Sequence, residues 1–153
     1  MIVIGYQGIG KSTLAGKNNK YIDLESSNFW VNERRGDDWA EVYGNIAEHL
    51  SKQGYVVFTS SHEVVRNRLK NSDERVVVAF PCVDLKNKWI SKLKERYNSS
   101  KSDKNYKAYI NAEDRYEENI QELMMECFDL GYFDCIVINE IEYDLEMLIN
   151  QAL

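Results

Sequence analysis

The chain has 153 residues, of which 44% are hydrophobic and 29% are charged. A chain of this length and apolar content suits one folded domain with a packed core, which excludes an intrinsically disordered protein. The formal net charge of −6 argues against broad electrostatic attraction to nucleic-acid polymers or to anionic membranes. We therefore expect any anionic ligand to be held by a local cluster of donors.

The cysteine pattern and the hydropathy bear on where the protein works. The three cysteines lie far apart and form no CxxC pair, which argues against a zinc site and against a disulfide framework. No run approaches the ~18 apolar residues of a membrane-spanning helix, and no signal-peptide pattern precedes the first apolar run. We therefore expect a cytoplasmic protein with reduced cysteines and no membrane partner.

The first sixty residues predict two strands, a helix and a third strand. The apolar runs MIVI and KYIDL have the length of short strands buried on both faces, and a glycine-rich loop separates them. In GDDWAEVYGNIAEHLSKQG, apolar residues recur at helical spacing and define an expected buried face: Trp39, Tyr43, Ile46, Ala47 and Leu50. Asp37 or Asp38 can cap the start of this helix, and Gly54 lies where a glycine commonly ends one. The run YVVFTS predicts the third strand.

The rest of the chain predicts two more strands and three helices. After the strand RVVVAF, the stretch DLKNKWISKLKERY has Asp84 as its expected N-cap and carries an apolar stripe: Leu85, Trp89, Ile90 and Leu93. The polar stretch YNSSKSDKN (residues 97–105) has no apolar anchor after its tyrosine and predicts a flexible loop. A long helix follows from about Tyr106 to Leu130, then the strand DCIVIN and the closing helix EYDLEMLINQAL.

Strands that alternate with helices predict an α/β fold, with a parallel sheet and helices on both faces. No internal repeat or linker divides the chain, so we expect a single domain over residues 1–153. In such a sheet, ligands bind beyond the carboxyl ends of the strands. The first strand ends in the glycine-rich loop, and the second, third and fifth end in the polar clusters DLESS, TSSH and NE. We expect these clusters to share one edge of the sheet.

The loop after the first strand, GYQGIGKS (residues 5–12), fits the Walker A pattern G-x-x-x-x-G-K-[ST] without a mismatch, and we call it the phosphate loop. In this pattern, backbone N–H groups cradle phosphate oxygens beside the start of a helix, and glycines permit the tight turns. The lysine reaches the β and γ phosphates, and the hydroxyl residue ligates Mg²⁺. We therefore expect a nucleoside triphosphate with Mg²⁺ here, with contacts from Gly5, Gly8, Ile9, Gly10, Lys11, Ser12 and Thr13.

With this loop and these strand ends, the sequence resembles small P-loop kinases of the group that contains nucleoside monophosphate, shikimate and gluconate kinases. The resemblance rests on GYQGIGKST, YIDLESSNF, VVFTSSHEVVRNRL and FPCVDLKNKWISKLKERY. The short helix after the loop is also similar to that of bacteriophage nucleotide-kinase-like proteins. The resemblance implies a P-loop NTPase three-layer sandwich with five parallel strands in the order 2-3-1-4-5. It also implies an acceptor-binding insertion at about residues 25–38, a mobile lid at about residues 95–107, and ATP with Mg²⁺ as cofactors. We expect a monomer or homodimer.

The resemblance assigns roles to individual residues. Lys11, Asp23 and Arg96 match catalytic positions, with Arg96 as a lid arginine that closes on the transferring phosphoryl group. Ser12 and Asp23 match the magnesium ligands. The residues that match acceptor-binding positions are Glu25, Ser26, Arg34, Ser60 and Arg66. One departure is that the third and fifth strands end in FTSS and CIVINE, without the aspartate common there, so Asp23 is the nearest substitute.

These residues leave several functions open. Four arginines favour a phosphate-bearing acceptor such as a nucleoside or deoxynucleoside monophosphate: Arg34, Arg35, Arg66 and Arg96. A small hydroxyl metabolite is the alternative acceptor, with Asp23 or Glu25 taking its proton. An NTP hydrolase is the rival enzyme, for which Gln7 is the only hint of a water-positioning residue. The alternative that is not an enzyme is a nucleotide-binding module without kinase activity. In each case we expect a small-molecule partner and no nucleic-acid polymer.

Overall fold

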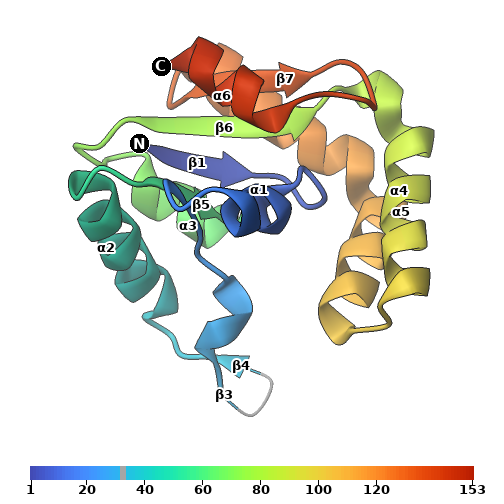
Figure 1. Cartoon of the computed structure of the whole chain (residues 1–153), viewed down its shortest axis with the longest axis horizontal. Helices are drawn as coiled ribbons and strands as arrows, with labels where there is room; N and C mark the ends of the chain where they lie inside the picture. Colours follow the sequence, from blue (N-terminus) through green and yellow to red (C-terminus); the bar gives the residue numbers. More distant parts are fainter. Residues whose placement is uncertain (32–33) are drawn as a thin grey trace.

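The computed structural model describes residues 1–31 and 34–153, and for residues 30, 31, 34 and 35 it describes the backbone alone. Within these ranges, five parallel strands form one sheet: β1 (Ile2–Gly5), β2 (Tyr21–Asp23), β5 (Val56–Thr59), β6 (Val76–Pro81) and β7 (Asp134–Ile138). Their order is β2-β5-β1-β6-β7 (Figure 1). Counted along the chain this is 2-3-1-4-5, so the predicted α/β fold and its strand order are confirmed.

Helices connect the strands and cover the sheet: α1 (Lys11–Lys17), α2 (Trp39–Lys52), α3 (Glu63–Leu69), α4 (Lys86–Ser99), α5 (Asp103–Met124) and α6 (Leu145–Ala152). α2 packs on β1 and β5, α5 packs on β6, and α6 packs on β7. Shorter helical segments are η1 (Ser26–Phe29), η2 (Val83–Leu85) and the π-helix η3 (Met125–Asp129). A small antiparallel pair that the sequence did not predict, β3 (Trp30–Val31) and β4 (Arg34–Arg35), lies between η1 and α2 (Figure 1). None of the helices in the described ranges is long and apolar enough to cross a membrane.

The sheet brings together the ends of the strands that carry the predicted site residues. Every residue of β1 and of β5 is buried, which explains why these strands are continuous apolar runs rather than alternating ones. The parallel register places Ile4 beside Thr59 and Asp23 beside Phe58. The phosphate loop, the end of β2 and the end of β5 therefore lie at one edge of the sheet, as expected.

The buried face of α2 differs from the predicted one. Ile46 is 36% exposed, whereas Gly44 and Ser51 are buried. α2 packs against α3 at this point, and a Cβ atom at Gly44 would lie 2.7 Å from Cγ of Arg68. The prediction counted apolar residues only, so it missed a small residue that makes room for a long side chain from the neighbouring helix.

The polar stretch at residues 97–105 is mostly helical, so the predicted flexible loop is wrong. α4 and α5 leave only residues 100–102 between them. Ser102 caps α5, because its hydroxyl accepts a hydrogen bond from the backbone N–H of Asn105 at 3.1 Å. The two helices form a hairpin whose arms pack side by side (Figure 1). The lid role of residues 95–107 stays a prediction.

Candidate functional site

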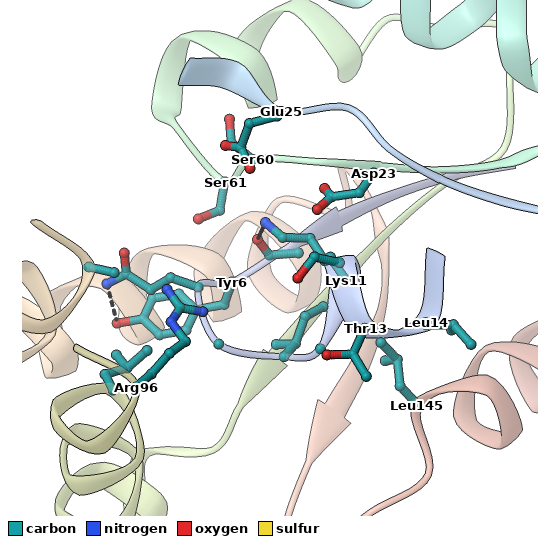
Figure 2. Close-up of a pocket in the computed structure, with 18 of the residues that line it drawn as sticks. Tyr6, Lys11, Thr13, Leu14, Asp23, Glu25, Ser60, Ser61, Arg96 and Leu145 are labelled. Atoms are coloured by element: carbon teal, nitrogen blue, oxygen red, sulfur yellow. Dashed lines mark hydrogen bonds between the residues drawn. The ribbon is translucent and has the colours of Figure 1, made fainter. Parts of the chain in front are cut away.

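A cleft of about 1640 Å³ surrounds the phosphate loop at the carboxyl edge of the sheet (Figure 2). Its walls come from the loop, the ends of β2 and β5, the start of α3, the α4–α5 hairpin and the segment before α6. All predicted site residues with described side chains line it: Gly5, Gly8, Ile9, Gly10, Lys11, Ser12, Thr13, Asp23, Glu25, Ser26, Ser60, Arg66 and Arg96. The prediction for Arg34 falls outside the side chains that the structure describes.

Two glycines give the phosphate loop its shape. Gly8 has a φ of 87° and Gly10 a φ of 105°, which lie in the left-handed region that other residues rarely adopt. A Cβ atom at Gly8 would in addition lie 2.8 Å from Cδ2 of Leu93. Position 8 therefore needs glycine both for the backbone conformation and for the close packing of the loop on α4.

Lys11 folds back over the phosphate loop. Its Nζ donates to the carbonyl oxygen of Gly5 at 3.0 Å and to that of Thr59 at 3.4 Å. The carboxylate of Asp23 points toward this ammonium (Figure 2). Burial lowers the pKa of Lys11 to about 8, and the negative charges of Asp23 and Glu25 offset part of that effect. A desolvated cation of this kind is typical of a site that binds an anion.

The carboxylate at the end of β2, Asp23, and the one just after this strand, Glu25, have different surroundings. Burial raises the pKa of Asp23, and the positive charge of Lys11 offsets part of this shift. Glu25 forms an ion pair with Lys104 in the first turn of α5. Burial by itself would raise the pKa of Glu25, but the hydrogen bond and the charge of Lys104 outweigh it, so this pKa lies below its usual range. Glu25 thus ties the tip of the hairpin to the sheet edge, whereas Asp23 faces the phosphate loop.

Arg96 reaches into the cleft from α4 (Figure 2). Its Nε is buried and has no hydrogen-bond partner among the described residues. Burial lowers the pKa of Arg96, and the nearby charge of Glu25 offsets part of that effect. Since buried polar groups in proteins are nearly always hydrogen-bonded, this Nε is a donor for which the described residues supply no acceptor.

Arg66 lines the same cleft but already has strong partners. Its Nε donates to the carboxylate of Glu126 at 2.8 Å, and its Nη2 donates to that of Glu122 at 2.7 Å. The side chain of Arg66 is only 6% exposed. These two carboxylates tie Arg66, and with it α3, to α5 and η3, and the acceptor contact of Arg66 stays a prediction.

Two aromatic side chains, Trp89 and Tyr143, bind the carbonyl groups of the phosphate loop, and we call them the aromatic pair. Nε1 of Trp89 donates to the carbonyl oxygen of Gln7 at 2.9 Å, and the hydroxyl of Tyr143 donates to that of Ile9 at 2.8 Å. The two rings are nearly parallel (14°), with centroids 6.2 Å apart. Sequence reasoning placed Trp89 on a buried stripe and gave Tyr143 no role, because these bonds join residues 82 and 134 positions apart.

An amide network joins the phosphate loop to α5. Nε2 of Gln7 donates to Oδ1 of Asn111 at 3.1 Å, and Nδ2 of Asn119 donates to the same oxygen at 2.8 Å. The same wall of the cleft carries basic side chains: Lys104, Lys107 and Arg115. Gln7, the candidate water-positioning residue, is therefore held by the hairpin side of the cleft.

The predicted magnesium ligands come from two elements, with Ser12 in the first turn of α1 and Asp23 at the end of β2, and both line the cleft. Among the described residues, no group of three or more His, Cys, Asp and Glu side chains is arranged to hold a metal ion. Comparison with protein-family models and with curated proteins finds no match for this chain.

Proposed function

We propose that this protein is an ATP-dependent phosphotransferase of the small P-loop kinase class, which moves the γ-phosphate of ATP to a small-molecule acceptor. The observation that carries the proposal is the position of Lys11. Its Walker A loop lies at the carboxyl edge of a parallel sheet of order 2-3-1-4-5, and its ammonium is partly buried in a large cleft. A cation at this point neutralises charge on the β and γ phosphates, which is the main requirement of phosphoryl transfer.

The residues present fit a magnesium nucleotide. In the free protein, Lys11 donates to backbone carbonyls, and a phosphate oxygen would replace these with a stronger charge-assisted hydrogen bond. Ser12 and Asp23 would hold Mg²⁺. When bound, the ion would neutralise phosphate charge and help to orient the γ-phosphoryl group. Asp23 would do so from β2 because β5 ends in Thr59 instead of an aspartate.

The size of the cleft favours a kinase over a hydrolase. Sites for one small ligand usually enclose about 300–1,000 Å³, whereas this cleft has about 1640 Å³. It extends from the phosphate loop toward Leu145 at one end and toward Glu25 and Ser60 at the other (Figure 2). A hydrolase needs room for a nucleotide and a water, but a kinase also needs room for an acceptor. We place the donor nucleotide at the Leu145 end and the acceptor between β2, α3 and α5.

We propose a nucleoside or deoxynucleoside monophosphate as the acceptor. Basic side chains on α5 line the cleft, and Arg96 reaches into it from α4 with a buried Nε that has no partner among the described residues. Such donors suit a second phosphate group. A small hydroxyl metabolite is the second candidate, and Asp23 favours it: this carboxylate lies near Lys11 and burial raises its pKa, as suits a general base.

An acceptor screen tests the proposal. ADP release from MgATP would be measured with a panel of nucleoside monophosphates, deoxynucleoside monophosphates and polyhydroxyl compounds, beside a control without acceptor. We expect at least one acceptor to raise the rate well above the control, with the phosphorylated product identified by phosphorus NMR. Nucleotide binding with the same ADP release in every reaction would favour the hydrolase, and nucleotide binding without ADP release would favour the binding module.

The lowered pKa of Lys11 should make nucleotide affinity depend on pH. In the free protein this side chain is charged below about pH 8 and neutral above it. A bound triphosphate favours the charged form, so binding above this pH must take up a proton. We expect the Kd of MgATP to rise about tenfold between pH 7 and pH 9, with uptake of about half a proton at pH 8.

Titration calorimetry in two buffers of different ionisation enthalpy would measure the proton uptake. Lys11→Arg is the matched control, because arginine stays charged over this pH range and should show neither the uptake nor the loss of affinity. Identical pH profiles for the two proteins would contradict the assignment of the titration to Lys11.

A further inference from the structure

The aromatic pair determines how the peptide groups of the phosphate loop are turned. Trp89 is fully buried on α4, and Tyr143 lies in the segment before α6. One binds the carbonyl of Gln7 and the other that of Ile9. These are the peptide groups that precede the two glycines of the loop with positive φ, Gly8 and Gly10.

The orientation of these carbonyls dictates where two N–H groups point. The loop contains no cis peptide bond, and in a planar trans peptide the C=O and the following N–H point in opposite directions. The N–H groups of Gly8 and Gly10 therefore point away from the donors of Trp89 and Tyr143. Within the described part of the chain, neither N–H donates a hydrogen bond. Both glycines line the cleft, and among the described residues no partner competes with a ligand for either donor.

Lys92 fixes the direction of the Tyr143 hydrogen bond. Its Nζ donates to the hydroxyl of Tyr143 at 3.2 Å and lies 4.2 Å from the ring centroid of Trp89. An ammonium can only donate, so the hydroxyl accepts from Lys92 and gives its own proton to Ile9. Burial raises the pKa of the Tyr143 hydroxyl, which keeps that proton in place. A hydroxyl that accepts from a cation is also a stronger donor.

The same contacts attach α4, the helix that carries Arg96, to the phosphate loop. Trp89, Lys92, Leu93 and Arg96 follow one another at helical spacing on one side of α4. Trp89 and Leu93 pack directly on Gly8, and a Cβ atom there would lie 3.3 Å from Nε1 of Trp89. The base of the hairpin is therefore fastened to the phosphate loop, two turns before the guanidinium that reaches into the cleft.

We infer that Trp89 and Tyr143 are positioning residues for phosphoryl transfer. They hold two loop carbonyls on the outer side so that the N–H groups of Gly8 and Gly10 face the nucleotide phosphates, and they set the place of Arg96 relative to those phosphates. This inference rests on the proposed function. It differs from a purely structural role of the pair, which would affect folding stability and leave the loop amides unchanged.

The test removes the two side-chain donors to the loop carbonyls and keeps an aromatic ring at both positions, although Tyr143→Phe also removes the acceptor of Lys92. Tyr143→Phe deletes the donor to Ile9, and Trp89→Phe deletes the donor to Gln7. Tyr116→Phe is the matched control, because the hydroxyl of Tyr116 also donates to a backbone carbonyl, that of Cys82 at 2.7 Å, and the substitution keeps the ring that packs on Tyr6 of the loop. We expect similar losses of Tm in the two Tyr→Phe variants and a larger loss in Trp89→Phe, because the smaller ring leaves a cavity at a fully buried position. Only Tyr143→Phe and Trp89→Phe should weaken MgATP binding, each by about tenfold, which corresponds to one net hydrogen bond.

Amide spectra of the free proteins supply a readout that a structural role would not move. Loss of a carbonyl's hydrogen bond shifts the following N–H, so Tyr143→Phe should shift the signal of Gly10 and Trp89→Phe that of Gly8. If the wild type binds MgATP but the Tyr143 variant binds within twofold of it, the inference is overturned and the proposed function stands. Equal weakening by Tyr116→Phe would likewise overturn it. A wild type that binds no nucleotide overturns the proposed function itself.

Discussion

Replacing Lys11 with alanine should abolish nucleotide-dependent turnover and leave the fold intact. We expect kcat/KM to fall by at least about a hundredfold, as when one preorganised charge is removed from a transition state. Stability at pH 7 should not fall, because the folded-state pKa of Lys11, about 8, lies below its ordinary value of 10.5. The charged side chain therefore opposes folding. This contribution is complete below about pH 8 and vanishes above about pH 10.5.

MgATP affinity by calorimetry and thermal unfolding by circular dichroism would be compared with the wild type. Lys52→Ala is the control, since Lys52 is exposed at the end of α2 and away from the cleft. It should match the wild type in both measurements. Undiminished nucleotide binding by the Lys11 variant would reject the phosphate loop as the nucleotide site.

Replacing Arg96 with alanine should lower kcat by about a thousandfold, the lower end of what an arginine supplied to a transferring phosphoryl group contributes. The Kd of MgATP should change by less than about threefold, because this arginine acts mainly on charge that develops in the transition state. The buried Nε of Arg96 has no partner among the described residues, so the substitution breaks no hydrogen bond at that atom. The Tm should therefore stay near that of the wild type.

A conservative variant separates the charge of Arg96 from its geometry, and a second variant, at Arg75, serves as a control. Arg96→Lys keeps the charge but loses the planar fork, and it should recover only part of kcat. Arg75→Ala removes an exposed arginine that pairs with Asp134 at 3.6 Å, and it should leave kcat unchanged. A loss of MgATP affinity as large as the loss of kcat in Arg96→Ala would place this side chain in ground-state binding instead.

The core strands could be read from the sequence because each is a short, uninterrupted apolar run, and burial on both faces demands that composition. The predicted edge with the phosphate loop, Asp23 and Thr59 followed from parallel pairing, since carboxyl ends of parallel strands lie together. The helical ends on both sides of the α4–α5 turn are not evident from composition, because a polar stretch without apolar anchors is also typical of a flexible loop. The local hydrogen bond between Ser102 and Asn105 caps a helix within that polar stretch.

The loop pattern by itself indicated a phosphate site, because the glycines, the lysine and the hydroxyl residue act through backbone conformation and local charge. Which other cations are available to a ligand was decided only by the tertiary structure. Arg66 and Arg96 look alike in sequence, yet Arg66 is paired with carboxylates 56 and 60 residues away, while the buried Nε of Arg96 has no partner among the described residues. The lowered pKa of Lys11 and the aromatic pair behind the loop likewise depend on burial by residues distant in the chain. Local pattern encodes backbone conformation, but pairing and desolvation arise from packing between elements, and they decide what each charged side chain can do.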